Sequence, residues 1–357
     1  MKSRRPYITM VVVFALTALL PFVLSAYYLH MAIMVLMWAF LATAWNILGG
    51  YGGQHSLGNG LFMGIGAYGA AYLVLHGNVS PWLSMVIFGV VAGAAGAGVG
   101  YITFRYGLRG AYFALVTIAL TEAAVYVVSN WNALGASNGL SLPLAQENNF
   151  AKLQFLTEKG YFYVILVLLL VLIVFVRWLT GQRFGFRLVA VRENEDAAEA
   201  LGVGTMATKM YAIILSAAIT AVGGVFYISL FNYVNPRSVF GEAVSVQILL
   251  YAIVGGLSTV WGPIVGAALL VPFAEIVRGS VIGQQIQGAY LLGYGVVLVL
   301  VMLFMPNGVV GLANRIRHRL RGSEPGDREE GGAGRKSPAP VELKAPPPSV
   351  REDGGAL

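Results

Sequence analysis

The 357-residue sequence contains no cysteine, and only 11% of its residues are charged. The missing cysteine excludes disulfide bonds, thiolate metal sites and catalytic thiols. The low share of charge excludes an ordinary soluble domain, in which about 25% of residues are charged. Hydrophobic residues make up 57% of the chain. This composition predicts a polytopic membrane protein.

Residue patterns that carry catalysis are also absent. No G-x-x-x-x-G-K-[ST] stretch occurs, so the chain lacks the loop with which P-loop ATPases hold nucleotide phosphates. The histidines lack the spacing of a metal site; they are His30, His55, His76 and His318. The net charge of +7 does not indicate nucleic-acid binding, because the basic residues cluster at the ends of apolar runs. We therefore expect no enzyme, no metal and no cofactor in this chain.

Ten apolar runs approach the length of about 20 residues that a membrane-spanning helix needs. They are 7–26, 31–48, 61–76, 82–104, 111–129, 161–179, 209–230, 244–260, 261–278 and 288–304. Basic residues precede the first run as in a signal peptide, but the run can span and no A-x-A cleavage site precedes Tyr27. We expect it to be retained. The predicted fold is an all-α transmembrane helical bundle of about ten spans, some of them broken, over residues 1–312.

Arginines in the short loops predict the orientation of these spans. Arg4 and Arg5, the loop with Arg105 and Arg109, the arginines between 177 and 192 and those between 315 and 321 all fall on one side. The positive-inside rule assigns this side to the cytoplasm, together with both termini. The tail 313–357 is rich in Gly, Pro, Glu and Lys without periodicity and is predicted to be disordered.

Two glycine-containing stretches predict local packing. The run 244–278 must turn back on itself at GGLSTVWGP to keep the last arginines on the cytoplasmic side, either as a full hairpin or as a re-entrant pair. The stretch Gly89–Gly100 carries small residues at three- and four-residue spacing, which lets helix backbones approach closely. We expect it to be a helix contact.

A third glycine-rich stretch, Gly49–Gly60, interrupts the apolar pattern and is polar. Non-helical backbone at membrane depth is tolerated only where it is buried in protein or lines an aqueous path. The polar side chains here could recognise a zwitterionic solute, or they could only satisfy backbone groups freed by the break. Glu122 lies in the middle of another apolar run, where a charge costs at least ~2.5 kcal/mol, and is either a path-lining or a structural group. The candidates for a substrate path are Asn46, Gln54, Ser56, Asn59 and Glu122.

The polar stretch Arg183–Gly204 lies between two apolar runs. Asn194 is a good N-cap, acidic residues follow it, and Gly202 is suited to the left-handed position after a helix. The predicted two-turn helix is too short to be stable alone in water. Its small side chains favour docking to another protein; a solvated loop is the alternative. The predicted contacts are Arg192, Glu193, Asn194, Ala197, Ala198, Glu199 and Gly202.

Four stretches resemble, in order, the motifs of one transporter family. They are GYGGQHSLGNGLFMGIGAY, GLRGAYFALVTIALTE, RFGFRLVAVRENEDAAEALGV and VGGLSTVWGPIVGAALL. The family is that of the LivM-type permeases of branched-chain amino acid ABC importers, and the resemblance extends from about residue 31 to 312. The chain departs from the family pattern at Ala111, Leu142 and Phe186.

The resemblance implies a type II-like importer permease in the bacterial inner membrane. Its partners would be a second permease subunit, two cytoplasmic ABC ATPases that bind ATP and Mg, and a periplasmic solute-binding protein. ATPase contact would then be made by the loop 183–204. The implied solutes are branched-chain or related small hydrophobic amino acids, although urea and short-chain amide permeases share these motifs. An ion-coupled secondary carrier using Glu122 is a less favoured alternative, because no basic partner lies in a neighbouring span.

Overall fold

The apolar runs of the sequence form the long helices of the fold. The computed structural model describes residues 5–144, 147–279, 293, 295–296 and 308–311, all within the unit Met1–Ile316. In this part of the chain seven helices are long and apolar enough to cross a membrane, and two shorter apolar helices accompany them. The predicted helical polytopic fold is confirmed. The run 288–304, apart from three positions, and the tail 313–357 lie outside the described residues.

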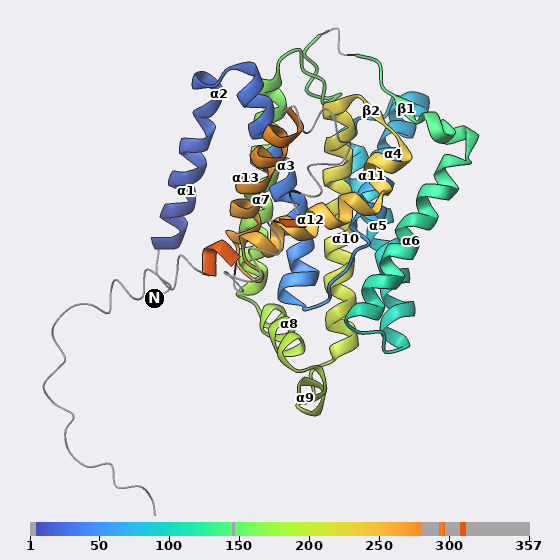
Figure 1. The fold of residues 1–357 in the computed structure, drawn as a ribbon, viewed down its shortest axis with the longest axis vertical. Helices are drawn as coiled ribbons and strands as arrows, with labels where there is room; N and C mark the ends of the chain where they lie inside the picture. Colours follow the sequence, from blue (N-terminus) through green and yellow to red (C-terminus); the bar gives the residue numbers. More distant parts are fainter. Residues whose placement is uncertain (1–4, 145–146, 280–292, 294, 297–307, 312–357) are drawn as a thin grey trace, which may run out of the picture. The chain divides into compact units, whose positions relative to one another are not determined.

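Most helices follow one another along the chain with short connections, and the longest connection joins α6 to α7 (Figure 1). They are α1 (Arg5–Ala18), α2 (Leu20–Val23), α3 (Ala26–Asn46), the π-helix η1 (Ile47–Tyr51), α4 (Asn59–Gly77), α5 (Pro81–Arg105), α6 (Ala111–Ser129), the 3₁₀ turns η2 (Asn132–Leu134) and η3 (Ala136–Asn138), α7 (Glu158–Thr180), α8 (Arg183–Glu193), α9 (Glu195–Ala200), α10 (Thr205–Phe231), α11 (Pro236–Phe240), α12 (Glu242–Gly255) and α13 (Gly262–Gly279).

Helix α10 packs closely on α4 and α5 because small residues line the contacts. A Cβ atom added to Gly66 would lie 2.1 Å from the carbonyl oxygen of Ala221, and one added to Gly96 would lie 2.8 Å from the Cβ of Ala217. The predicted helix contact of Gly89–Gly100 is therefore confirmed. Such close backbone approach replaces the hydrophobic driving force that helices lack in lipid.

The first long helix breaks as predicted. Helix α3 passes into the π-turn η1, the chain is non-helical from Gly52 to Gly58, and α4 starts at Asn59. The π-turn is buried, and the backbone N–H of Gln54 donates to the carbonyl of Leu48 at 3.1 Å. The break is thus held inside the protein, where freed backbone groups find partners.

The run 244–278 turns back on itself, as predicted. Helices α12 and α13 pack against each other and touch through glycines: a Cβ on Gly255 would lie 1.7 Å from the Gly262 carbonyl oxygen, and one on Gly266 would lie 1.8 Å from that of Tyr251. Only glycine at positions 255 and 266 permits this close approach, so these glycines allow the chain to turn at 256–261.

The small amount of strand structure joins the α6–α7 connection to the segment that follows α10. The strands β1 (Leu140–Ser141) and β2 (Tyr233–Val234) pair antiparallel, with Leu140 opposite Val234. Since β2 directly follows the C-terminus of α10, whereas α9 precedes its N-terminus, the sheet and the α8–α9 segment lie at opposite ends of α10 (Figure 1). The sequence did not predict these strands.

Candidate functional site

The short helix α9 has the local structure that the sequence predicts. The Asn194 side chain accepts a hydrogen bond from the backbone N–H of Ala197 at 3.0 Å, and Gly202 has a φ of +82°. Helix α8 before it was not predicted. The sequence does contain a helical pattern here, because the apolar residues Leu188 and Val191 have the spacing of one helix face. Both are buried in the structure.

A buried ion pair anchors α9 to the bundle. The Lys209 Nζ lies 2.5 Å from Oε1 of Glu195, and the side chains are 4% and 12% exposed. The guanidinium of Arg109, between α5 and α6, lies 3.2 Å from the other Glu195 oxygen and 3.0 Å from Asp196. The hydrogen bond to Asp196, followed by the charge of Glu195, raises the pKa of Arg109. One carboxylate thus connects α9 with α10 and with the α5–α6 connection, which the sequence did not indicate.

The two faces of α9 differ in exposure. Ala197, Glu199 and Leu201 are exposed, Leu201 by 86%, whereas Ala198 is only 3% exposed. Ala198 therefore lies against the bundle, where its small side chain allows close packing, and not on the outer face. Leu201 is the prominent apolar side chain of the outer face and was not among the predicted contacts. The exposed residues remain candidates for docking.

Arg192, at the end of α8, connects this segment to both glycine breaks. Its Nη1 donates to the hydroxyl of Ser258, in the α12–α13 turn, and to the carbonyl of Gly50, in η1, at 3.5 Å. The Ser258 hydroxyl also donates to the Gly50 carbonyl at 2.6 Å. Gly53 has a φ of +68°, and a Cβ there would lie 2.7 Å from Cγ of Arg192. Glu193 pairs with the same guanidinium at 2.5 Å.

The amide of Asn46 and the hydroxyl of Ser56 are fully buried and bound to backbone. The Asn46 amide donates to the carbonyl of Thr259 at 3.0 Å and accepts from the N–H of Ser258 at 3.1 Å. The hydroxyl of Ser56 accepts from the N–H of Gly58 at 3.1 Å. For these two candidates the geometry favours the structural interpretation over a place in the substrate path.

The other two polar candidates keep unused acceptors. Asn59 is fully buried and donates to the Thr220 hydroxyl at 3.1 Å, but within the described residues its Oδ1 accepts no hydrogen bond. Gln54 is 8% exposed, and its Oε1 is likewise without a partner in that part of the chain. A buried acceptor without a partner is unfavourable, so these amides are suited to a polar occupant.

Glu122 lies against the start of a neighbouring helix. Its Oε1 accepts a hydrogen bond from the backbone N–H of Glu242, the first residue of α12, at 3.2 Å. A carboxylate at this position satisfies a free N–H and interacts favourably with the helix dipole. Among the described residues no group of three or more His, Cys, Asp or Glu could hold a metal ion. The observed contact gives Glu122 a capping role.

Residues 27–306 match the family described as "Branched-chain amino acid transport system / permease component". The chain belongs to this family. It shares 29% identity over 312 residues with the high-affinity branched-chain amino acid transport system permease protein LivM of Escherichia coli K12, covering 81% of this chain and 71% of that protein. LivH of the same organism is 22% identical over 291 residues, covering 77% of this chain and 91% of LivH.

A third similar protein comes from another organism. The probable branched-chain amino acid transport permease protein LivH of Methanocaldococcus jannaschii is 26% identical over 272 residues, covering 70% of this chain and 80% of that protein. No solved structure gives a significant match to the chain. The family and the apolar helices together identify a multi-pass membrane permease.

Proposed function

We propose that this chain is the permease subunit of an ABC importer that moves branched-chain or related small hydrophobic amino acids across the bacterial inner membrane. Its family and the transport systems after which its relatives are named support this solute class. A second permease subunit, two cytoplasmic ATPases that bind ATP and Mg, and a periplasmic solute-binding protein complete the importer. Energy then arrives from outside this chain, at α8 and α9.

The contact of Arg192 with both glycine breaks is the main structural support for this proposal. Its guanidinium binds the Gly50 carbonyl and the Ser258 hydroxyl, so a displacement of α8 acts directly on η1 and on the α12–α13 turn. These are the points at which helical continuity is already interrupted. Movement of broken helices against a bundle is a known route to alternating access. Closure of the ATPase dimer on α9 supplies the displacement.

The Lys209–Glu195 pair makes this loop a rigid attachment. A short helix held only by backbone hydrogen bonds would fray. Here the buried ion pair and the additional contact of Arg109 join it to α10 and to the α5–α6 connection. Loss of one partner from a buried pair costs about 3–5 kcal/mol, so the attachment can transmit force without local unfolding.

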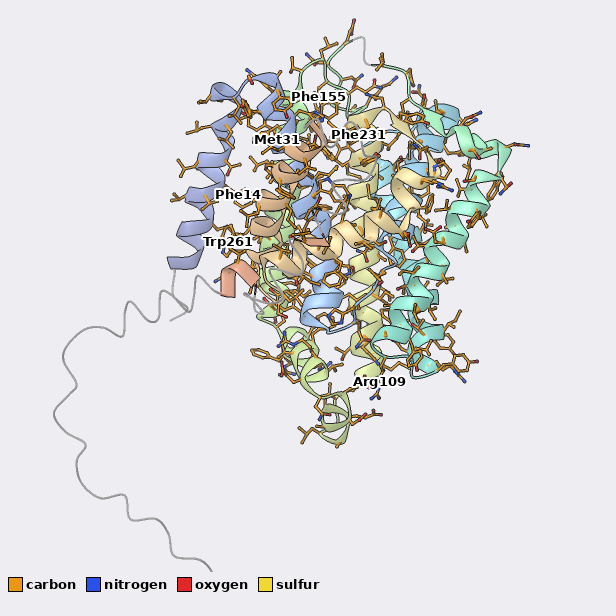
Figure 2. All side chains as sticks on the ribbon, in the orientation of Figure 1. Phe14, Met31, Arg109, Phe155, Phe231 and Trp261 are labelled. Carbon is orange, nitrogen blue, oxygen red and sulfur yellow. The ribbon has the colours of Figure 1, made fainter. Side chains whose placement is uncertain are left out.

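The distribution of arginine supports the proposed orientation. Arg109 lies at the same end of the bundle as α9, whereas Phe155 lies at the other end (Figure 2). The α8–α9 end also carries Arg105, Arg183 and Arg187. An excess of arginine in short loops is typical of the cytoplasmic side. We therefore assign α9 and both termini to the cytoplasm, and β1 and β2 to the periplasmic side.

An ion-coupled carrier is a weaker proposal for this chain. Glu122 would be its proton-binding group, but this carboxylate already accepts the Glu242 N–H. A urea or short-chain amide importer differs only in solute. Proteoliposomes with the complete importer separate these functions: ATP-driven uptake of radiolabelled leucine that persists in the presence of an uncoupler supports the proposal. Uptake that collapses with the uncoupler despite ATP contradicts it, and ATP-driven uptake of radiolabelled urea or acetamide with none of leucine changes the solute class.

A further inference from the structure

A cavity of about 500 Å³ opens between α3, α10, α11, α12 and α13. Met31 and Phe231, which line it, lie close together at the end of the bundle opposite Arg109 (Figure 2). Its volume falls within the ~300–1,000 Å³ of small-molecule sites. The cavity contains none of the substrate-path candidates of the sequence. Its polar lining consists of His30, Arg237, Ser238, Gln247 and Glu275 together with tyrosines.

Gln247 and Arg237 present unused hydrogen-bonding groups to this cavity. Gln247 is only 6% exposed, yet its side-chain amide makes no hydrogen bond within the described residues. In the same part of the chain the guanidinium of Arg237 has neither an ion-pair nor a hydrogen-bond partner. Buried amides are normally hydrogen-bonded, so a polar occupant is expected beside Gln247.

The cavity also carries charges of both signs, from different helices. Arg237 is on α11, and Glu275 is on α13. His30 pairs with Glu158 at 2.9 Å, and Glu275 also has an interaction of its own. Arg237 is therefore the cavity cation that lacks a partner among the described residues. Apolar side chains of Met31, Met34 and Trp38 line the remainder. Arginine binds carboxylates through a planar pair of N–H groups, and a carboxylate with an amide oxygen suits an ammonium group.

We propose that this cavity binds a small zwitterionic amino acid with an aliphatic side chain. Arg237 binds its α-carboxylate, the amide oxygen of Gln247 accepts from its α-ammonium, and the carboxylate of Glu275 attracts the same ammonium. The aliphatic part packs on Met34 and Trp38. The inference rests on the proposed function and deepens it, because it places a solute site in the permease itself, on the side that receives solute from the binding protein.

The test is equilibrium binding of radiolabelled leucine to the purified importer without the solute-binding protein. Arg237→Gln and Gln247→Leu should each weaken leucine binding about tenfold or more, which corresponds to losing one charged or buried hydrogen-bonded contact. Ala243→Trp, which fills the cavity from a small lining residue, should abolish binding. Lys152→Gln, an exposed cation of the α6–α7 connection, is the matched control and should bind leucine as the wild type does.

Competition by charged analogues separates a recognition role from a structural one. Leucinamide lacks the carboxylate, and 4-methylpentanoate lacks the ammonium. The wild type should reject both, Arg237→Gln should bind leucinamide relatively better, and Glu275→Gln should bind 4-methylpentanoate relatively better. Unchanged discrimination in both variants overturns the site.

The results distinguish failure of this cavity proposal from failure of the proposed function. If the complete wild-type importer takes up leucine and all cavity variants bind and transport it normally, the cavity proposal is wrong and the function stands. If a variant fails to assemble, the remaining variants and the analogue competition decide whether the cavity binds leucine. If the wild-type importer moves no amino acid with ATP, the function itself is wrong.

Discussion

The ammonium of Lys209 lies 2.5 Å from the carboxylate of Glu195, and both side chains are largely buried. The cation belongs to α10, which packs against α3, α4 and α5, whereas the anion belongs to the six-residue helix α9. Two charges removed from water must stay paired, since an unpaired one is strongly unfavourable. The pair therefore fixes the exposed helix α9 to α10, a helix that packs inside the bundle.

Lys209→Met tests this attachment. The substitution removes the ammonium and leaves Glu195 with Arg109 alone, so we expect a loss of stability that approaches the ~3–5 kcal/mol of a broken buried pair. Thermal unfolding of the purified permease measures it. The double variant Lys209→Met/Glu195→Gln removes both charges and should recover part of the loss. A single variant as stable as the wild type would show that the pair contributes nothing.

Arg192→Gln tests the connection between α8 and the glycine breaks. We expect the assembled importer to keep hydrolysing ATP while leucine uptake falls by about tenfold or more, because a force on α8 no longer reaches Gly50 and Ser258. Arg187→Gln, an exposed arginine on the same helix, is the control and should retain uptake. Equal uptake by the two variants would refute the connection.

Gly53→Ala and Gly107→Ala form a matched pair. Both glycines have φ near +67°, so alanine costs about 1–3 kcal/mol of backbone strain at either position. A Cβ on Gly53 also collides with Arg192, whereas one on Gly107 meets nothing within 4 Å. We expect only Gly53→Ala to impair transport in the reconstituted importer. Similar losses in both variants would assign the effect to strain alone.

Substitutions on the exposed and on the buried face of α9 should have different effects. Leu201→Ser changes an exposed side chain and should leave the permease folded while weakening its co-purification with the ATPases. Ala198→Arg places a long charged side chain where only 3% of the residue is exposed, so it should destabilise the permease itself. Size-exclusion profiles and affinity co-purification separate the two. Normal ATPase binding by Leu201→Ser would remove this residue from the docking surface.

Local sequence patterns predicted the features that depend on neighbouring residues. The Asn194 cap, the left-handed Gly202, the break within Gly49–Gly60 and the turn at GGLSTVWGP all follow from short-range chemistry, and the structure confirms each. Helix α8 was missed because its arginines led to a loop interpretation, although its buried residues repeat with helical spacing.

Contacts between distant parts of the chain were not predictable from one sequence. Glu122 meets Glu242, 120 positions away, and Arg109 meets Asp196, 87 positions away. The sequence identified Glu122 as an unusual charge and placed the acidic residues of α9 in its first turn, but it did not indicate their partners. It also left the roles of Asn46 and Ser56 open, and only their backbone partners favour a structural role.

The most direct test of the account is cross-linking from a single introduced thiol, since this chain has no cysteine of its own. Ala197→Cys places a single thiol on the exposed face of α9, and Ser137→Cys places one in the α6–α7 connection at the other end of the bundle. A thiol-to-amine cross-linker is then applied to the assembled importer. The account predicts that Ala197→Cys captures an ATPase subunit and that Ser137→Cys does not. Capture of an ATPase by Ser137→Cys, with none by Ala197→Cys, would contradict it.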